Sequence, residues 1–344
     1  MQANTFSIKE NTSLRSFNTF AIDAQARYFA VVQQPEELHA LLLEPAFQQI
    51  PKLVLGEGSN ILFTQDYRGL VIKNAIKGID RLSEDKDHIW IKVGGGENWH
   101  DFVMYCVEHG YGGIENLSLI PGTVGAAPVQ NIGAYGVELC NVFSTLEAMN
   151  LQDGTIRVFT YEECQFGYRD SVFKNQYKNQ YVILSVTLRL DKKHTFRVDY
   201  GNIQEVLNTM QIKDLSIKAI SDAVIHIRRN KLPDPRQLGN AGSFFKNPLI
   251  PSADFYELKK SFPGVPSYTS ENSDDIKIPA AWLIEQCGFK GKRFGDAGVH
   301  EKQALILVNY NASKGSAILE LAQEIQKSVQ EKFNVQLVTE VNLI

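Results

Sequence analysis

Residues 118–136 read Ser118-Leu-Ile-Pro-Gly-Thr-Val-Gly-Ala-Ala-Pro-Val-Gln-Asn-Ile-Gly-Ala-Tyr-Gly136. Four glycines stand here among small apolar residues, and the stretch contains no Lys, Arg, Asp or Glu. Glycines let the main chain approach a ligand and present its N–H groups, while Pro121 and Pro128 stiffen the path between them. The composition favours a bound cofactor held by backbone donors, but a connection buried between two layers has a similar composition.

Two more glycine turns follow apolar segments. Lys52–Leu55 leads into Gly56-Glu-Gly-Ser-Asn60, and the alternating run His88–Val93 leads into Gly94-Gly-Gly96. Three such turns favour a ligand site. The first begins like G-x-G-x-x-G, but Ile61 replaces the third glycine and no helical pattern follows, so we do not expect a Rossmann domain.

Composition excludes several classes of function. The chain has 344 residues, 44% of them apolar, and suggests two or three domains. Its 35 basic and 39 acidic residues are scattered, so we expect no nucleic-acid partner. The four cysteines form no C-x-x-C pair and have no nearby histidine, which predicts reduced packing residues and no metal site. No signal sequence and no apolar segment of about 20 residues is present, so we expect a cytoplasmic protein without membrane insertion.

Hydrophobic periodicity predicts an α+β chain. Strands are expected at residues 27–32, 52–55, 69–73, 88–93, 142–151, 155–160, 181–190, 304–310 and 336–344. Helices are expected at residues 36–43, 99–109, 202–210, 221–229, 252–261, 279–287 and 316–333. The turn Asp153-Gly154 between two of the strands favours an antiparallel or mixed sheet.

A second dense stretch, Gly239-Asn-Ala-Gly-Ser-Phe-Phe-Lys-Asn-Pro248, contains Ser243. A turn serine usually caps a backbone group, and without a nearby histidine it is no conventional nucleophile, although it could donate a proton. Arg169 and Glu340 are unexceptional in isolation. The residues alone therefore indicate a cofactor-binding α+β enzyme of undefined chemistry.

Together these stretches resemble a bacterial cell-wall flavoprotein family, the UDP-N-acetylenolpyruvoylglucosamine reductases. The resemblance runs in order through nearly the whole chain, on residues 14–20, 56–60, 120–128, 130–136, 168–171, 231–235, 239–248 and 337–341. It implies a fold of the vanillyl-alcohol-oxidase type, in which two α+β subdomains bind FAD and a third domain binds the substrate. The expected parts are residues 1–70, completed by the strand at 336–344, then 71–217, and a substrate-binding domain at 218–335.

The resemblance implies a non-covalent FAD held by main-chain contacts, and none of the seven histidines is needed for its attachment. The implied cofactor-binding residues are Gly56, Glu57, Gly58, Ser59, Asn60, Pro121, Gly122, Thr123, Gly125, Ala126, Asn131, Gly133, Ala134, Tyr135 and Gly136.

The implied reaction is the NADPH-dependent reduction of UDP-N-acetylglucosamine enolpyruvate to UDP-N-acetylmuramate. By motif position, Ser243 is the general acid, Arg169 stabilises the enolate, and Glu340 is a second stabiliser. Glu340 could donate a hydrogen bond if burial raises its pKa, or it could orient Ser243 or a water molecule.

The implied substrate-binding residues are Tyr200, Arg228, Lys231, Asn247, Tyr268 and Gln303. The segment around Tyr200 resembles the longer of two subtypes, in which this tyrosine closes over the substrate. Asn342 stands where the family often has arginine, which puts a cationic contact there in doubt.

Two alternatives stay open at this point. A related flavin oxidase would use oxygen and an alcohol substrate, and a binding module would hold flavin or UDP-sugar without turnover. We expect a monomer in which NADPH and the sugar nucleotide use overlapping space in turn.

Overall fold

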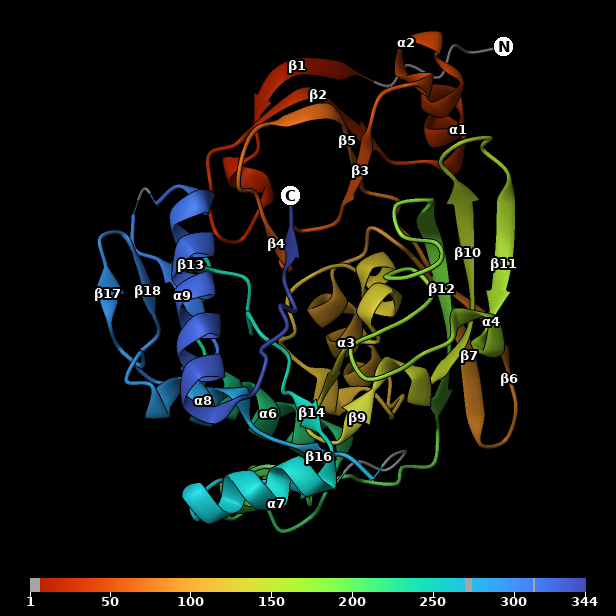
Figure 1. Cartoon of the computed structure of the whole chain (residues 1–344). Coiled ribbons are helices and arrows are strands. Elements are labelled where there is room, and N and C mark those ends of the chain that lie inside the picture. Colours follow the sequence, from red (N-terminus) through yellow and green to blue (C-terminus); the bar gives the residue numbers. More distant parts are fainter. Residues whose placement is uncertain (1–6, 270–273, 312) are drawn as a thin grey trace. The chain divides into compact units, whose positions relative to one another are not determined.

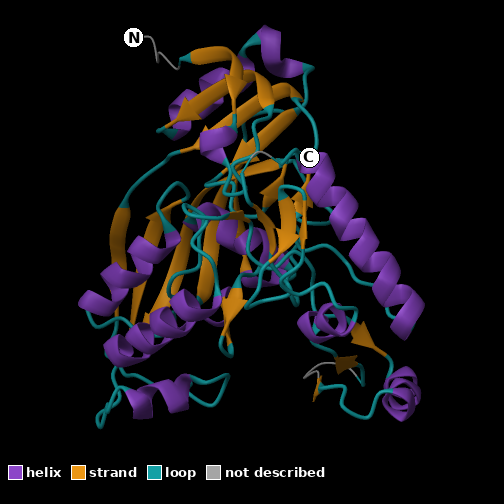
Figure 2. Cartoon of the chain, turned by 90° about the vertical axis from the view of Figure 1, so that its left-hand side faces the viewer, coloured by secondary structure: helices purple, strands orange, loops and turns teal. Residues whose placement is uncertain are grey.

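The structure is a computed structural model that describes residues 7–269, 274–311 and 313–344. The chain divides into two compact units, each assembled from separate parts of the sequence. Unit 1 comprises residues 1–12, 25–57 and 67–230, and unit 2 comprises residues 13–24, 58–66 and 231–344. Helices and strands occur along the whole described chain, as expected for an α+β protein (Figure 2). The three-part division expected from the sequence stays a prediction.

The first sheet of unit 1 has the strand order β1-β2-β5-β3 (Figure 1). Its strands are β1 (Ile8–Ser13), β2 (Gln25–Val32), β3 (Lys52–Leu55) and β5 (Tyr67–Asn74). Strand β5 pairs in parallel with both β2 and β3. Helices α1 (Pro35–Leu43) and α2 (Pro45–Gln48) each begin with a proline, whose fixed φ suits a first helical position. Buried leucines of α1 pack in one core cluster with β2 and β5.

The second sheet of unit 1 is antiparallel and has the order β11-β10-β12-β7-β6 (Figure 1). Its strands are β6 (Ile79–Glu84), β7 (His88–Gly94), β10 (Phe143–Asn150), β11 (Ile156–Thr160) and β12 (Tyr181–Asp191). The expected Asp153-Gly154 turn joins β10 to β11, and Gly154 has the positive φ of +72° that this turn requires. Trp99 and Phe102 of helix α3 (Trp99–Glu108) belong to the core that includes this sheet.

The remaining elements of unit 1 are short, apart from helix α6. They are η2 (Glu115–Leu117), η3 (Val124–Gln130), β8 (Gly133–Ala134), β9 (Val137–Glu138), η4 (Leu139–Asn141), α4 (Tyr161–Cys164), α5 (Ile203–Thr209) and α6 (Ile217–Lys231). The stretch Ser118–Gly136 is therefore not an irregular loop, because it contains the 3-10 helix η3 and the start of the β8–β9 hairpin.

In the described part of unit 2, short strands form three sheets. Strands β13 (Gly239–Asn240), β19 (Leu307–Asn309), β18 (Ala297–Val299) and β17 (Arg293–Phe294) form one sheet in that order. Strands β14 (Leu249–Ile250), β16 (Ile276–Lys277) and β15 (Tyr268–Thr269) form the second. Strand β4 (Ile61–Leu62) pairs in parallel with β20 (Asn342–Leu343).

Unit 2 also contains η1 (Arg15–Phe17), α7 (Ser252–Ser261), α8 (Ala280–Gln286) and α9 (Gly315–Phe333). The apolar stripe expected on the last helix is buried along its whole length, from Ile318 to Phe333. The strand expected at residues 336–344 is wrong over most of its length, since β20 covers only Asn342–Leu343. The strand expected at 304–310 is shorter, and the helix expected at 221–229 is longer.

Within the described ranges, none of the helices combines the length and the apolar character needed to cross a bilayer.

The glycines at 94–96 and 125 allow main-chain segments of unit 1 to cross. Gly95 N–H donates to the carbonyl of Leu184 on β12 at 2.7 Å, and Gly125 N–H donates to the carbonyl of Gly95 at 2.9 Å. A Cβ on Gly95 would lie 2.3 Å from the Ile183 oxygen, and one on Gly125 would lie 2.9 Å from Gly95. Glycine is therefore required at these positions because another main-chain segment of unit 1 packs against them.

We expect Gly95→Ala to lower the free energy of unfolding by about 1–3 kcal/mol, because the β12 backbone would have to move. Gly167→Ala is the matched control, since its Cβ would meet only the Asp170 side chain at an ordinary 3.6 Å. Urea unfolding of both variants measures the difference. Equal stabilities would contradict the crowding at Gly95.

Candidate active site

The predicted flavin-binding stretch of unit 1 is rich in left-handed backbone. Leu119, Asn131 and Tyr135 have φ of +60°, +44° and +51°, and Gly122 and Gly136 are also positive. Non-glycine residues adopt this conformation at a cost of about 1–3 kcal/mol, so the surrounding structure must hold them in place. Asn131 follows the 3-10 helix η3, and the N–H groups of Asn131 and Ile132 donate to the Pro128 and Ala127 carbonyls at 3.3 and 3.1 Å. The main chain of this stretch therefore follows a tight path that internal hydrogen bonds hold in place.

Glu57 connects two of the predicted cofactor-binding turns. Its Oε1 accepts a hydrogen bond from Asn98 Nδ2 at 2.6 Å, and its Oε2 accepts one from the Gly122 N–H at 3.0 Å. Asn98 also caps helix α3 through the Asp101 N–H. Lys73 Nζ donates to the Gly56 carbonyl at 2.6 Å. The Glu57 carboxylate thus fixes the main chain of both turns, and its contact with a cofactor stays a prediction.

Arg169 lies against the β8–β9 hairpin. Its Nη2 donates to the Gly133 carbonyl, and its Nη1 lies 3.5 Å from Glu138 Oε1. A Cβ on Gly133 would stand 2.8 Å from Arg169 Nη1, so a larger residue at this position would push the guanidinium aside. The structure therefore brings predicted catalytic Arg169 next to predicted cofactor-binding Gly133.

Arg228, on helix α6, reaches the same stretch from another direction. Its Nε donates to the Leu119 carbonyl at 3.3 Å, and its side chain hydrogen-bonds that of Tyr135. Burial lowers the pKa of Arg228, while Tyr135 acts in the opposite direction. Because burying a cation is costly, a guanidinium in this position is suited to receiving an anion.

His100, on α3, holds the other side of Leu119. The Leu119 N–H donates to His100 Nδ1 at 3.0 Å, which requires Nδ1 to be unprotonated. Burial lowers the pKa of His100. The negative charge of Asp101 raises this pKa, whereas the positive charges of Arg229 and Arg228 lower it.

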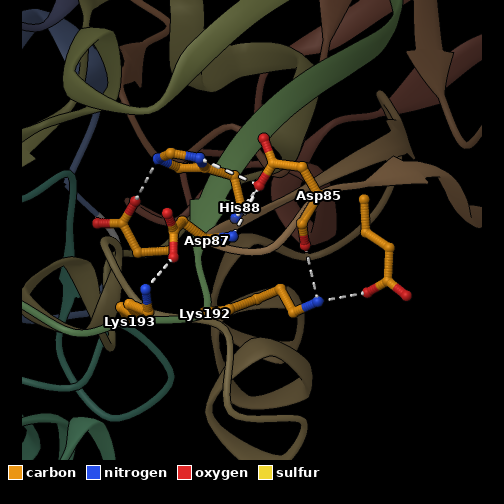
Figure 3. Close-up of polar contacts among 7 residues, drawn as sticks. Asp85, Asp87, His88, Lys192 and Lys193 are labelled. Atoms are coloured by element: carbon orange, nitrogen blue, oxygen red, sulfur yellow. Dashed lines mark hydrogen bonds and ion pairs between the residues drawn. The ribbon is translucent and has the colours of Figure 1, made fainter.

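Tyr200 belongs to a segment, residues 192–201, that begins at a cluster of charged side chains (Figure 3). Lys192 Nζ donates to Glu84 Oε2 at 2.9 Å and to the Asp85 carbonyl at 3.0 Å. Lys193 pairs with Asp87, and His88 lies between Asp85 and Asp191 at 3.4 and 3.7 Å. These contacts join the start of the segment to the turn between β6 and β7.

The far end of this segment rests on the β8–β9 turn. The buried Asn116 donates from Nδ2 to the carbonyls of Tyr135 and Arg197, both at 2.9 Å. Arg197 Nη1 donates to the Gly136 carbonyl at 3.0 Å. A Cβ on Gly136 would lie 3.3 Å from the Tyr200 Cβ, so Tyr200 packs beside this turn while remaining 54% exposed.

In unit 2, backbone pairing brings Ser243 and Glu340 onto adjacent segments. The Phe244 N–H donates to the Leu305 carbonyl, and the Glu340 N–H donates to the Phe244 carbonyl, both at 2.8 Å. Ser243 and Glu340 are both half-buried. Two of the three predicted catalytic residues thus lie on segments that are hydrogen-bonded to each other. That Arg169 joins them in one site stays a prediction.

The other predicted cofactor-binding residues of unit 2 lie in the same region. Asn60 Nδ2 donates to the Glu340 carbonyl at 3.3 Å. Asn342 donates to the Asn60 carbonyl through its N–H and through Nδ2, both at 3.0 Å. The residue that departs from the family pattern therefore holds the Asn60 turn with a neutral amide. Gly58 has φ of +64°, and its carbonyl accepts from Thr19 N–H.

The predicted substrate-binding residues of unit 2 have different surroundings. Asn247 Oδ1 accepts from the Ala280 N–H at 2.9 Å, at the start of α8. Gln303 Oε1 accepts from the Leu305 N–H at 3.4 Å. Lys231 and Tyr268 are exposed. Their roles stay predictions.

Asn98, Asn116 and Glu138 were not identified from the sequence. These residues contact predicted site residues and hold them in place. Only Asn98 carried a usable signal, because an asparagine before a helical pattern is a common N-cap. Among the described residues, no group of three or more His, Cys, Asp or Glu side chains could hold a metal ion.

Comparison with known proteins gives this geometry a family. Residues 26–160 match the model of an FAD binding domain, and residues 234–344 match the model of the UDP-N-acetylenolpyruvoylglucosamine reductase C-terminal domain. The chain is 55% identical to the UDP-N-acetylenolpyruvoylglucosamine reductase of Amoebophilus asiaticus, over 98% of this chain and 99% of that one. It is 47% identical to that of Flavobacterium johnsoniae, over 98% and 99%.

A solved structure has the same fold. The crystal structure of UDP-N-acetylenolpyruvylglucosamine reductase from Thermus caldophilus aligns with a TM-score of 0.69 at 24% identity, over 98% of this chain and 99% of that one. The α+β fold, with an FAD-binding part and a C-terminal domain, is thereby confirmed. The chain belongs to the UDP-N-acetylenolpyruvoylglucosamine reductase family and is a flavin-dependent oxidoreductase.

Proposed function

We propose that this enzyme reduces UDP-N-acetylglucosamine enolpyruvate to UDP-N-acetylmuramate with NADPH, in the cytoplasm, during synthesis of peptidoglycan precursors. The observation that carries the proposal is the pairing of the Ser243–Phe244 segment with Glu340, in a domain that matches the family model. This pairing keeps a hydroxyl and a carboxyl group on neighbouring segments, as a proton-donating site would require.

Residues 56–60 and 121–136 would hold FAD through main-chain groups. Their chemistry fits, since the longer stretch is uncharged and Gly122 and Gly136 have positive φ, where the missing side chain lets the main chain pass close to a ligand. Bound FAD supplies hydride-transfer chemistry between NADPH and the double bond. The residues of this chain have the tasks of binding, orienting and protonating the substrate.

The reaction adds a hydride to the methylene carbon and a proton to the carbon beside the carboxylate. Negative charge develops on that carboxylate as an enolate, and the Arg169 guanidinium would stabilise it. The Ser243 hydroxyl would then donate the proton. Glu340 would donate a hydrogen bond in its protonated form, or else orient Ser243 or a water molecule.

The UDP part would be held by cations and by aromatic side chains. Arg228 and Lys231 would face the diphosphate, with Asn247 and Gln303 as neutral partners. Tyr200 and Tyr268 would cover the substrate, and their exposed fractions of 54% and 55% leave both rings accessible.

We expect Ser243→Ala to separate the two half-reactions. NADPH should bleach the flavin at the wild-type rate, whereas reoxidation by the enolpyruvyl substrate should slow by about 10²–10⁴-fold, because only the second step needs the proton. Stopped-flow absorbance measures both rates. Ser261→Ala, at the exposed end of α7, is the control, and equal losses in both half-reactions would make Ser243 a structural residue.

NADPH and the sugar nucleotide should compete for one space. The glycine turn at residues 56–60 is followed by strand β4 and lacks the helix of a Rossmann nucleotide site. We expect initial rates to give parallel double-reciprocal lines, with each substrate inhibiting competitively against the other. Intersecting lines, which indicate a ternary complex, would refute this order of binding.

Acid should destabilise the enzyme through His100. Its pKa in the folded chain is lowered, so the neutral ring contributes stability above the ordinary value of about 6.5, and that contribution is lost as the pH falls toward the folded pKa. His100→Asn keeps an acceptor for the Leu119 N–H but cannot titrate.

Urea unfolding at pH 7.5 and 5.5 should therefore show a larger loss of stability in the wild type than in His100→Asn. His300, whose pKa is also lowered by burial, is present in both proteins and cancels. Identical losses would mean that His100 does not titrate differently in the folded chain.

A further inference from the structure

Glu138 connects three parts of unit 1. It ends strand β9, and its Oε1 lies 3.5 Å from Arg169 Nη1. Its Oε2 accepts a hydrogen bond from Asn131 Nδ2 at 2.9 Å and lies 3.8 Å from Cys140 Sγ. The side chains of Arg169 and Glu138 are 19% and 35% exposed, so this ion pair is partly shielded from water.

The conformation of Arg169 is specific. Its backbone is left-handed, with φ of +52°, and its guanidinium lies 5.3 Å from the centre of the Tyr168 ring. The Gly133 carbonyl holds the Nη2 side of the guanidinium, and Glu138 holds the Nη1 side. Because the guanidinium is planar, two contacts along its edge fix both its plane and its direction.

Buried side chains keep Glu138 itself from moving. Asn131 is fully buried, and besides Glu138 its Nδ2 donates to the Gly167 carbonyl at 3.1 Å. Its Oδ1 accepts from the Cys140 N–H at 3.0 Å. Ser171, also fully buried, donates to the Val129 carbonyl at 2.7 Å. The segment that carries Arg169 is thus attached to η3 and to its C-cap residue, on both sides of the arginine.

Crowding at Gly133 completes the arrangement. A Cβ there would lie 2.8 Å from Arg169 Nη1 and 2.9 Å from Glu138 Cγ. The two side chains therefore occupy the space that any larger residue at position 133 would need.

We propose that Glu138 is a positioning residue for Arg169, which sets the direction of the guanidinium toward the enolate of the substrate. The inference rests on the proposed function, since it gives Arg169 the stabilising role. Partly exposed ion pairs add little to stability. Their effect on rate can be large, because a small displacement of a charge-stabilising group costs up to about 10²-fold.

Glu138→Gln tests the proposal, since glutamine keeps the size and an acceptor for Asn131 but loses the charge. We expect reoxidation of reduced enzyme by the enolpyruvyl substrate to slow by about 10–100-fold. Flavin reduction by NADPH should stay within about twofold, as should FAD affinity measured by fluorescence and the affinity of the oxidised holoenzyme for UDP-N-acetylmuramate measured by calorimetry.

Glu147→Gln is the matched control. Glu147 is 38% exposed, pairs with Lys92 at 2.7 Å and accepts from Ser185, on the second sheet of the same unit. It should leave both half-reactions unchanged.

A double-mutant cycle with Arg169→Ala identifies the route of the effect. If Glu138 acts through Arg169, then Glu138→Gln should slow reoxidation by less than about twofold in the Arg169→Ala background. Equal slowing in both backgrounds, or equal losses in both half-reactions or in FAD affinity, would overturn the proposal. Arg169→Ala without effect on reoxidation would instead refute the role of Arg169 in the proposed function.

Discussion

The crossing of main-chain segments at Gly95 is the constraint on which unit 1 depends. Here the end of β7 passes β12 and the start of η3, and hydrogen bonds from the Gly95 and Gly125 N–H groups join the segments. Asn74, at the end of β5, donates to the Ile183 carbonyl at 2.8 Å, which ties the first sheet to the second. No Cβ fits at Gly95, so these contacts form only with glycine. The position of the predicted flavin-binding stretch depends on this crossing, because the Gly125 N–H of that stretch donates to the Gly95 carbonyl.

The periodic elements could be predicted from the sequence because they bury one face in a regular pattern. Helix α7 has the expected bounds, and α9 buries the expected stripe. The strand expected at residues 336–344 failed for a physical reason. Its residues alternate in burial like a strand, but Val338 and Glu340 pair with Lys246 and Phe244 through single hydrogen bonds, and only β20 forms a ladder. Alternating apolar residues show that one face of a segment is buried. A β-strand also needs a neighbouring segment that forms a regular series of backbone hydrogen bonds with it.

The glycine-rich turns were interpreted from the sequence mainly as a sign of ligand binding, and the structure gives several of them a second cause. Gly95 and Gly125 are crowded by backbone, Gly56 by Thr123, and Gly133 by Arg169. Composition cannot separate these causes, since glycine is selected wherever anything approaches the main chain closely. For the same reason Glu138 could not be found, because its importance comes from a neighbour more than thirty residues away. The residues around Glu138 in the sequence do not indicate its contact with Arg169.

The two half-reactions of the proposed function use different side chains. Arg169 and the longer predicted flavin-binding stretch belong to unit 1, whereas Ser243 and Glu340 belong to unit 2. In the proposed reaction, accepting a hydride from NADPH requires neither the serine nor the arginine. Protonating the substrate would instead use both the proton donor and the stabilising cation. In the proposed reaction, the oxidative half-reaction therefore depends on the exact positions of these side chains, whereas the reductive one does not.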